Sequence, residues 1–394
     1  MPAALTLTIH MLGVDAHRAM ADQVRLGLTR SPKELPCRYF YDDRGSALFE
    51  QITELPEYYL TRAETEILEA RSDELATITR PQVIVELGAG ACTKTRLLIG
   101  SAHRAGSLRC FVPFDIGEGV LRGSVSEISS EFRDLEVHGI VGDFASHLDA
   151  IPRLGRQLVM FLGSTIGNFE VAERRRFLAS VRALLSDDDF FLLGVDLVKD
   201  ERELVAAYAD ARGVTAEFNR NLLNVLNREL GADFDVGSFE HVALWNAAAS
   251  RMEMHLRAEG AQRVRVPGAG LAAPLEISFH DGETVRTEIS VKFTRAIIER
   301  SFAEAGLDLR GWFTDSAQRF ALALATAIPL RHHALDLAEG DQLDVPHGED
   351  LEVSADDHVG EPAAGDAKLA RGFPKSQRLH MDVSSSSFTD SSPS

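Results

Sequence analysis

A stretch near residue 85 limits, more than any other, what this chain can fold into. A β-branched apolar run over residues 83–85 ends in Glu86, and Gly88 and Gly90 follow almost at once. A short apolar run bounded by glycines predicts a buried parallel strand that leads into a tight turn. Glycines there let a ligand approach the backbone, and the amides of the following helix suit a polar or anionic group. Plain turn chemistry explains the same residues equally well, so the stretch alone leaves both interpretations open.

Three further apolar runs along the chain end in polar residues. The run over 111–114 ends in Asp115, a third strand closes at Asp143 and Phe144, and a fourth over 158–162 enters a loop that contains Asn168. Helices are predicted between these strands, and the repeated alternation of strand and helix predicts a doubly wound parallel sheet. Open α/β sheets bind ligands at the carboxyl ends of their strands, so these polar side chains are candidate site residues.

The two acidic residues in this series have different interpretations. Asp115 closes the second strand a couple of dozen residues after the glycines, a position from which an acid can accept hydrogen bonds from ribose hydroxyls. Asp143 beside Phe144 can bind and stack an adenine. A helix cap with a core phenylalanine explains that second pair about as well.

The composition excludes several classes of function. The chain has 394 residues, 45% of them hydrophobic, and a formal net charge of −19 at pH 7. That charge argues against nucleic acid or an anionic membrane as a partner, since both need a basic face. Three cysteines show neither paired nor metal-like spacing, which favours a reducing compartment without disulfides or a metal site. With no signal-peptide pattern and no apolar run of roughly 20 residues, we expect a cytoplasmic protein.

A fifth strand is predicted at residues 190–198, and the alternation of strand and helix changes after it. Residues 201–227 are helical in pattern, and residues 274–295 alternate as strands around a turn at Asp281 and Gly282. Glu288 and Ser290 lie two apart in that alternation and therefore share a face. Beyond residue 330 the chain has thirteen acidic and five basic residues and ends in a serine-rich run. Such a tail cannot bury enough apolar surface to fold alone, so we expect it to be disordered.

The glycine motif and the acidic residues after the next two strands, in this order along the chain, resemble those of the class I S-adenosylmethionine-dependent methyltransferases. The resemblance rests on Glu86-Leu-Gly-Ala-Gly, on Asp115 and on Asp143-Phe144, whereas the glycine spacing of a dinucleotide dehydrogenase fails at Thr93. Over residues 15–328 the chain more specifically resembles the histidine Nα-methyltransferases that open ergothioneine biosynthesis. The matching segments are FYDDRGSALFEQITELPEYYLTR, ELGAGACTKT, GSTIGNF, LVKD, GVTAEFNRN and TEISVKF.

The resemblance implies an α/β fold with two parts. A Rossmann-like class I methyltransferase sheet, formed by residues 62–196 and 293–329, would bind the methyl donor. A smaller α+β substrate domain would be built from the N-terminal segment 1–61 and the insertion 197–292, and residues 330–394 would be the disordered tail. The family also implies S-adenosyl-L-methionine as methyl donor and free L-histidine as substrate. We expect a monomer, although no residue pattern determines the oligomeric state.

Site residues follow from the resemblance by matching position. The residues expected to bind the donor are Gly88, Lys94, Asp115, Asp143 and Phe144. Those expected to hold the amino and carboxylate groups of histidine are Tyr41, Tyr58, Asn168 and Tyr208, of which Tyr41 and Asn168 are the catalytic pair. Those expected around the imidazole ring are Glu288 and Ser290, with Met254 and Phe49 nearby.

Physical chemistry is consistent with these roles. Methyl transfer from a sulfonium needs a neutral amine lone pair, so the enzyme must orient the nitrogen and exclude water. Tyr41 and Asn168 can hold the nitrogen without placing a full negative charge beside the sulfonium. The Glu288 carboxylate can select imidazole, because an analogue without the ring N–H would leave the buried acid unpaired.

The chain also departs from the family. Residues Ala89, Ala91, Cys92 and Thr93 replace hydroxyl and acidic side chains that are usual in the glycine loop, which puts side-chain contacts to the donor in doubt. Two alternatives stay open: the same chemistry on another free amino acid such as tryptophan, or a catalytically silent protein that only binds the donor.

Overall fold

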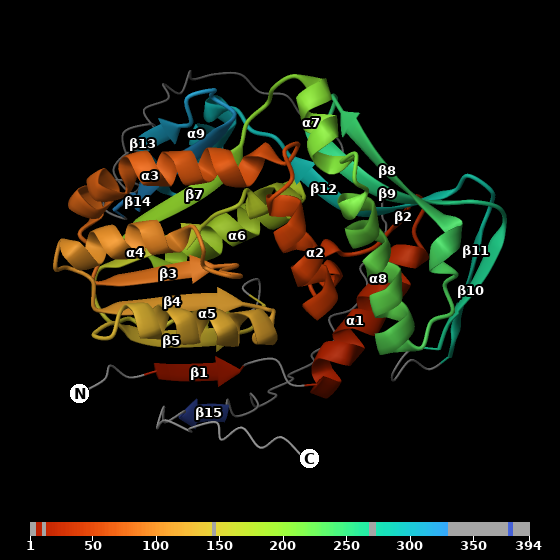
Figure 1. Cartoon of the computed structure of the whole chain (residues 1–394), viewed down its shortest axis with the longest axis horizontal. Helices are drawn as coiled ribbons and strands as arrows, with labels where there is room; N and C mark the ends of the chain where they lie inside the picture. The colour runs from red at the N-terminus through yellow and green to blue at the C-terminus, as the bar shows by residue number, and fades with distance from the viewer. Residues whose placement is uncertain (1–4, 10–12, 144–146, 268–272, 330–376, 381–394) are drawn as a thin grey trace, which may run out of the picture. The chain divides into compact units, whose positions relative to one another are not determined.

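The computed structural model describes residues 5–9, 13–143, 147–267, 273–329 and 377–380 (Figure 1). The described residues up to Ala327, together with Gln377–His380, form one compact unit. Among the described helices, none combines the length and the apolar character needed to cross a membrane. Phe144, one of the expected donor-binding residues, lies outside the described residues, as does most of the acidic tail.

A nine-stranded sheet organises this unit. Its spatial order is β13-β14-β7-β6-β3-β4-β5-β1-β15, and the six strands from β7 to β1 are parallel. The strands are β1 (Leu5–Ile9), β3 (Val83–Leu87), β4 (Cys110–Asp115), β5 (Glu136–Val141), β6 (Gln157–Phe161), β7 (Phe190–Asp196), β13 (Leu307–Thr314), β14 (Phe320–Ala327) and β15 (Gln377–His380). Antiparallel pairs at β14 and β13 complete one edge. The predicted doubly wound parallel sheet is confirmed.

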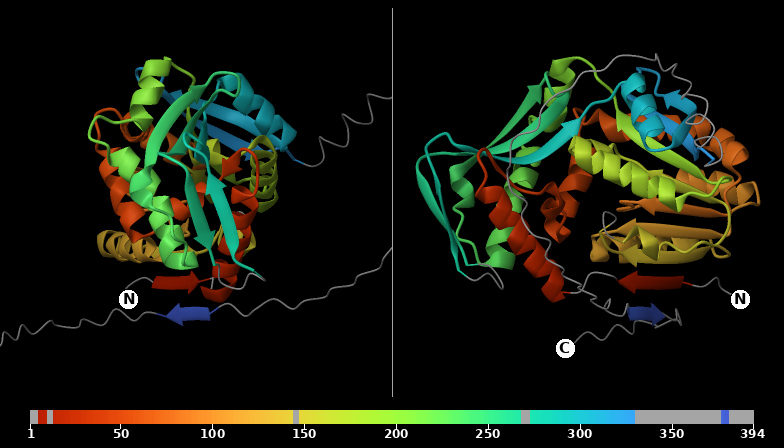
Figure 2. Two further views of the ribbon diagram at one scale, coloured as in Figure 1. Left: turned by 90° about the vertical axis from the view of Figure 1, so that its right-hand side faces the viewer. Right: turned by 180° about the vertical axis from the view of Figure 1, so that it is seen from behind.

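Helices cover both faces of this sheet, as Figure 2 shows. Ile84 of β3 packs into a core with α3 (Tyr59–Thr79), α4 (Thr95–Arg104) and α5 (Glu118–Glu131). Its neighbours Val83 and Val85 face the opposite core, with α6 (Val171–Leu184) and α9 (Arg295–Glu304). Because β3 is buried on both faces, its side chains apart from Glu86 are apolar without alternation, as expected for a central parallel strand.

A smaller sheet lies beside the first (Figure 1). Its order is β2-β12-β9-β8, with β12 antiparallel to β9 and β9 antiparallel to β8. The strands are β2 (Lys33–Glu34), β8 (Phe239–Asn246), β9 (Arg251–Ala258) and β12 (Thr284–Val291), and a separate pair is β10 (Gln262–Val266) with β11 (Leu275–Phe279). The associated helices are α1 (Gly13–Leu28), α2 (Asp43–Thr53), α7 (Glu201–Tyr208) and α8 (Val214–Leu230).

Strand β12 contains a β-bulge. Arg286 pairs with His255, but Glu288 pairs with Met254, so Thr287 is an extra residue on β12. The Thr287 hydroxyl donates to the Met254 carbonyl and to the Asn219 side chain, at 3.0 and 2.7 Å. A bulge of this kind re-aims the side chains that follow it.

The two ends of the chain differ from the predicted division. The resemblance places residues 1–61 in the substrate part, but β1 pairs in parallel with β5 and extends the large sheet. Gln377–His380, predicted to be disordered with the rest of the tail, forms β15 and pairs with β1. The alternating segment LTLTI is compatible with a strand, but a local pattern cannot reveal which distant strand it will join.

Candidate active site

The carboxyl ends of the parallel strands meet at one side of the large sheet, called here the carboxyl edge. Strand order reverses between β3 and β6, because the chain goes from β3 to β4 and β5 on one side and from β6 to β7 on the other. Ligands of open α/β sheets bind outside such a reversal point. The loops that begin at Gly88 and Gly163 flank it.

The glycine loop is built around backbone positions that favour glycine. Gly88 and Gly90 have φ of 69° and 51°, and Gly88 is exposed. Asp115 accepts the Gly90 N–H and the Gly117 N–H, both at 2.8 Å. Burial raises the pKa of Asp115, although these backbone hydrogen bonds lower it. Since each carboxylate oxygen can accept more than one hydrogen bond, Asp115 retains capacity for a ligand hydroxyl.

Lys94 lies beside the second loop of the carboxyl edge. It forms an ion pair with Glu64, a fully buried residue of α3. The Glu64 carboxylate also accepts the Gly163 N–H, at 2.9 and 3.1 Å. Sequence reasoning placed Lys94 among the donor contacts and missed Glu64, which ties the two loops at the reversal point together.

Asp143, the fourth expected donor contact, follows β5. The Arg38 guanidinium donates to its carboxylate at 2.6 Å. Arg38 belongs to the 3₁₀ turn at Cys37–Phe40, so the N-terminal segment reaches the donor side of the edge through this ion pair. Sequence reasoning did not single out Arg38.

Aromatic rings gather where the N-terminal segment meets α8. Tyr41 packs edge-on against Phe49 at 5.7 Å between ring centroids, and Phe49 packs edge-on against Tyr58 at 6.2 Å. Phe218 of α8 closes the group, at 5.7 Å from Tyr41 and 6.1 Å from Phe49. The structure therefore brings together three of the expected substrate residues, and it adds Phe218.

Asn168 lies in the 3₁₀ turn that follows β6 and faces the same N-terminal segment. Its side-chain amide donates to the Cys37 sulfur at 3.8 Å. Burial and Glu288 raise the pKa of the Cys37 thiol to about 12, so the thiol stays protonated near neutral pH. A Cβ on the neighbouring Gly167 would lie 3.4 Å from the Ser290 hydroxyl, which places this turn directly against β12.

Strand β12 supplies the next group of expected residues. Glu288 lies opposite Met254 across the antiparallel pair, and Ser290 follows on the same face. Burial raises the pKa of Glu288 to about 7, while Lys292 lowers it. The side chain is only partly accessible, so its carboxylate is a hydrogen-bonding group held in a poorly solvated site.

Tyr208 of α7 reaches β12 and belongs to a buried polar network. Its hydroxyl donates to Ser290 Oγ at 2.8 Å and accepts from Lys292 Nζ at 2.8 Å. Lys292 also pairs with Asp196 at the end of β7, at 2.8 Å, and both side chains are fully buried. Sequence reasoning missed Lys292 and Asp196. The sequence did contain a signal for Lys292, because residues 288, 290 and 292 continue the same alternation.

The phenols of this site keep their protons. Burial raises the pKa values of Tyr41, Tyr58 and Tyr208 well above the usual range, and nearby acidic groups such as Glu288 add to the shift. Neutral hydroxyls can both donate and accept hydrogen bonds. They can therefore orient an amine or a carboxylate without adding charge.

Comparison with known families decides what kind of protein carries this site. Residues 20–327 match the family model described as "Histidine-specific methyltransferase, SAM-dependent". The chain belongs to this family. The resemblance that the sequence motifs carried is thereby confirmed.

Two relatives in the histidine-specific methyltransferase family match nearly over their whole length. The histidine N-alpha-methyltransferase of Mycobacterium tuberculosis is 51% identical over 80% of this chain and 97% of its own. That of Mycolicibacterium smegmatis is 49% identical over 82% of this chain and 99% of its own. A solved S-adenosylmethionine-dependent methyltransferase from Clostridium acetobutylicum covers 71% of this chain and 97% of its own, at 10% identity and a TM-score of 0.40.

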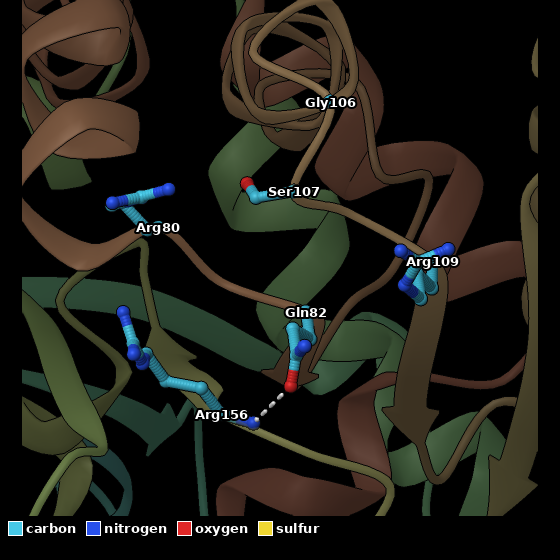
Figure 3. Close-up of a pocket in the computed structure, with 6 residues that line it drawn as sticks. All are labelled: Arg80, Gln82, Gly106, Ser107, Arg109 and Arg156. Carbon is cyan, nitrogen blue, oxygen red and sulfur yellow. Dashed lines mark hydrogen bonds between the residues drawn. The ribbon is translucent and has the colours of Figure 1, made fainter.

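The opposite side of the sheet, the amino edge, also has a pocket (Figure 3). It encloses about 330 Å³ and is lined by Arg80, Gln82, Gly106, Ser107, Arg109 and Arg156. The three arginine side chains are exposed. The Gln82 side-chain oxygen accepts the backbone N–H of Arg156 at 3.1 Å. These residues precede the strands of the sheet, so the pocket lies away from every expected site residue that the structure describes.

A possible metal-ligand group lies at the amino edge as well. Cys110, Glu136 and His138 place their ligand atoms within 4.8 Å of one another. Cys110 and Glu136 begin β4 and β5, which puts the group at the far ends of the strands from the carboxyl edge. A catalytic site without a metal remains a prediction.

Proposed function

We propose that this member of the histidine-specific methyltransferase family transfers three methyl groups from S-adenosyl-L-methionine to the α-amino group of free L-histidine. The product is hercynine, and the reaction is the first step of ergothioneine biosynthesis. The family match and the 51% identical relative support the activity. The observation that carries the substrate is the placement of Glu288 and Ser290 on one strand against the Asn168 turn.

The donor side has groups suited to each part of the methyl donor. The donor supplies an electrophilic methyl on a sulfonium sulfur. Asp115, with lone pairs left over from two backbone N–H groups, would accept the ribose hydroxyls. Lys94, held by Glu64 beside Gly163, would pair with the donor carboxylate. Gly88 would leave room at the backbone, and Asp143 with Phe144 would hold the adenine.

The substrate side has neutral groups near the reacting nitrogen and a carboxylate near the ring. Tyr41 and Asn168 would orient the α-nitrogen, and Tyr58 and Tyr208 would hold the carboxylate of histidine. Glu288 and Ser290 would bind the imidazole, with Phe49 and Met254 as apolar walls. The tyrosines keep their protons because burial raises their pKa values, so the site places no phenolate beside the sulfonium.

These residues accelerate the reaction by orientation and by exclusion of water. The amine is a nucleophile only in its neutral form, and a displacement at carbon requires nitrogen and methyl in line. The aromatic cluster of Tyr41, Phe49, Tyr58 and Phe218 lies beside that position and keeps it poorly solvated. Because the nitrogen must turn between methylations, hydrogen bonds from neutral groups suit three rounds better than a fixed ion pair.

We further propose that the protein acts as a cytoplasmic monomer on a small-molecule substrate, without nucleic acid or membrane. The net charge of −19 supports the last two points. The cysteines Cys37, Cys92 and Cys110 are all free, as in a reducing compartment. Light scattering coupled to gel filtration should give one chain mass, and a doubled mass would contradict the monomer.

A turnover screen tests the proposed function. Purified protein, S-adenosyl-L-methionine and each free amino acid in turn should give mono-, di- and trimethylated product from histidine alone, followed by mass spectrometry. Preferred turnover of another amino acid such as tryptophan would establish the alternative substrate. Calorimetric binding of the donor without methylation of any amino acid would establish a silent donor-binding protein.

A further inference from the structure

Three side chains at the amino edge share one face of the large sheet. Cys110 of β4 lies opposite Glu136 of β5 in the parallel pair, and His138 follows Glu136 by two residues. Residues that face each other across paired strands, and residues two apart along one strand, lie on the same side of a sheet. A thiol, a carboxylate and an imidazole therefore meet there, with their ligand atoms within 4.8 Å of one another.

The His138 ring is held at its other nitrogen. Strand β1 lies beside β5 (Figure 1), and Thr6 of β1 is opposite His138. The Thr6 hydroxyl is hydrogen-bonded to His138 Nδ1 at 2.6 Å, while Nε2 lies on the side of Glu136. A hydrogen bond at the far nitrogen fixes the orientation and the tautomer of a metal-ligating histidine. Thr6 can serve this purpose by accepting the Nδ1 proton.

The nitrogen that would bind a metal is otherwise unpaired. His138 Nε2 is buried, and among the described residues it has no hydrogen-bond partner. Glu136 Oε2 lies 3.6 Å away, beyond the range of a good hydrogen bond. The Cys110 thiol makes a weak contact of 3.8 Å with the Phe111 carbonyl. Buried polar atoms are almost always paired, so an unpaired imidazole nitrogen beside a thiol and a carboxylate indicates a shared ligand.

We propose that Cys110, Glu136 and His138 bind a zinc ion that links β4 to β5 at the amino edge. Thiolate, imidazole and carboxylate are all zinc ligands, and the two negative ones balance the charge of the ion. Calcium and magnesium prefer oxygen ligands alone, so the sulfur and the nitrogen exclude them. Binding replaces the thiol proton by the metal, and the proton goes to water.

The distances suit zinc after a small adjustment. Ligand atoms around tetrahedral zinc lie about 3.5 Å apart, given bonds of about 2.0 to 2.3 Å. His138 Nε2 and Glu136 Oε2, at 3.6 Å, already meet this requirement. The other separations are at most 4.8 Å and need to shorten by about 1 Å. Because Glu136 is exposed, its side chain can move, and a water molecule can reach the fourth position.

The ion would lie at the beginning of two strands whose other ends carry expected donor contacts. Strand β4 begins at Cys110 and ends at Asp115, and β5 leads toward Asp143. Five residues of strand separate Cys110 from Asp115 by roughly 17 Å, so the ion takes no part in methyl transfer. Its effect is on stability, because it joins two strands that are paired only in the folded chain. The inference is therefore independent of the proposed function.

Cobalt(II) is the probe, because it occupies zinc sites and absorbs light. The full-length protein is stripped with a chelator and titrated with Co²⁺ in a reductant without thiols. We expect a thiolate-to-cobalt charge-transfer band that saturates at one ion per chain and disappears when Zn²⁺ is added. Histidines elsewhere in the chain cannot produce this band, since it requires a sulfur ligand. Absence of the band at saturating Co²⁺ would overturn the proposal.

Variants assign the band to these residues. Cys110→Ser should abolish it, and His138→Gln should weaken cobalt binding by about 100-fold or more. Thr6→Val should weaken binding about tenfold, because it removes the group that orients the imidazole. Cys92→Ser changes another buried thiol and is the matched control, for which we expect no change. A band that Cys110→Ser keeps, or that Cys92→Ser loses, contradicts the proposal.

Glu136→Gln covers the case in which Cys110→Ser does not fold. Glu136 is exposed, so this variant should fold as wild type does by circular dichroism, yet bind cobalt about tenfold more weakly. Thermal unfolding gives a second measurement: Zn²⁺ should raise the Tm of wild-type protein and leave that of His138→Gln unchanged. An equal rise in both proteins would place the stabilising ion elsewhere and overturn the proposal.

Discussion

The two edges of the large sheet differ in how their charged residues are arranged. A pocket lies at the amino edge, and the candidate active site lies at the carboxyl edge. The amino edge has a pocket lined by three exposed arginines, while the carboxyl edge carries buried charges that contact one another. Exposed charged side chains stay solvated and can move, so they do not hold neighbouring groups in a defined geometry. Buried charges must be paired, and pairing fixes their geometry. In this protein the arrangement of paired charges, rather than the presence of a cavity, marks where chemistry is expected.

The largest effect on activity is expected when a side chain that is proposed to orient the reacting nitrogen is removed. Asn168→Ala should lower kcat for histidine by about 100-fold or more, because a misoriented amine reacts slowly. Initial rates by mass spectrometry measure the effect, with Arg109→Ala at the amino edge as the control. A loss smaller than threefold would show that Asn168 does not orient the nitrogen.

Glu288→Gln should affect activity and stability in opposite directions. Loss of a charged hydrogen bond to the ring should lower kcat/KM for histidine by about 10- to 100-fold. The folded pKa of about 7 is above the ordinary 4.5, so the native state binds more protons than the unfolded state between these values. Wild-type stability should therefore fall as pH rises from 4.5 to 7.

The stability part is checked by urea denaturation of both proteins at pH 4.5 and pH 8. At pH 8 the Gln variant should be more stable than wild type by about 1 to 3 kcal/mol, and the difference should vanish at pH 4.5. Equal stability at both pH values would show that Glu288 is not poorly solvated.

Asp115→Asn tests the donor side of the carboxyl edge. Asparagine can accept through one atom only, so the Gly90 or the Gly117 N–H loses its partner and the ribose contact weakens. We expect KM for S-adenosyl-L-methionine to rise about tenfold while KM for histidine changes little. A rise confined to histidine would place Asp115 on the other side of the reaction.

The smallest effect is expected at the amino edge. Changing Arg80, Arg109 and Arg156 together to Met should alter kcat/KM less than twofold and stability by about 0.5 kcal/mol, because exposed charges contribute little. The same rate and denaturation assays apply. A large loss of activity would show that the pocket influences the reaction, and the contrast between the edges would fail.

Sequence reasoning predicted the local elements of the fold well and the distant pairings poorly. The strand at Val83–Leu87 and the sheet around it follow from apolar periodicity, which is a local property. The pairings of β1 with β5 and β15 are long-range, and the short segments involved fit many partners.

The candidate site shows the same limit. Tyr41, Phe49 and Tyr58 were assigned to the substrate by motif, and the structure places them together. Lys292 could have been found by continuing the alternation beyond Ser290. Asp196 and Glu64 could not, because a buried acid at a strand end or on a helix reveals its partner only once the chain has closed.

The regular alternation that follows Thr287 makes strand β12 sensitive to a particular kind of mutation. Glu288, Ser290 and Lys292 share one register, which the bulge sets. A point substitution can change one of these side chains while the others stay in place. Deletion of the single codon for Ile289 would instead turn the residues after it over, so that Val291 and not Ser290 would share the face of Glu288. Substrate preference in this protein can therefore evolve gradually by substitution, but a shift of one residue would erase it in a single mutational step.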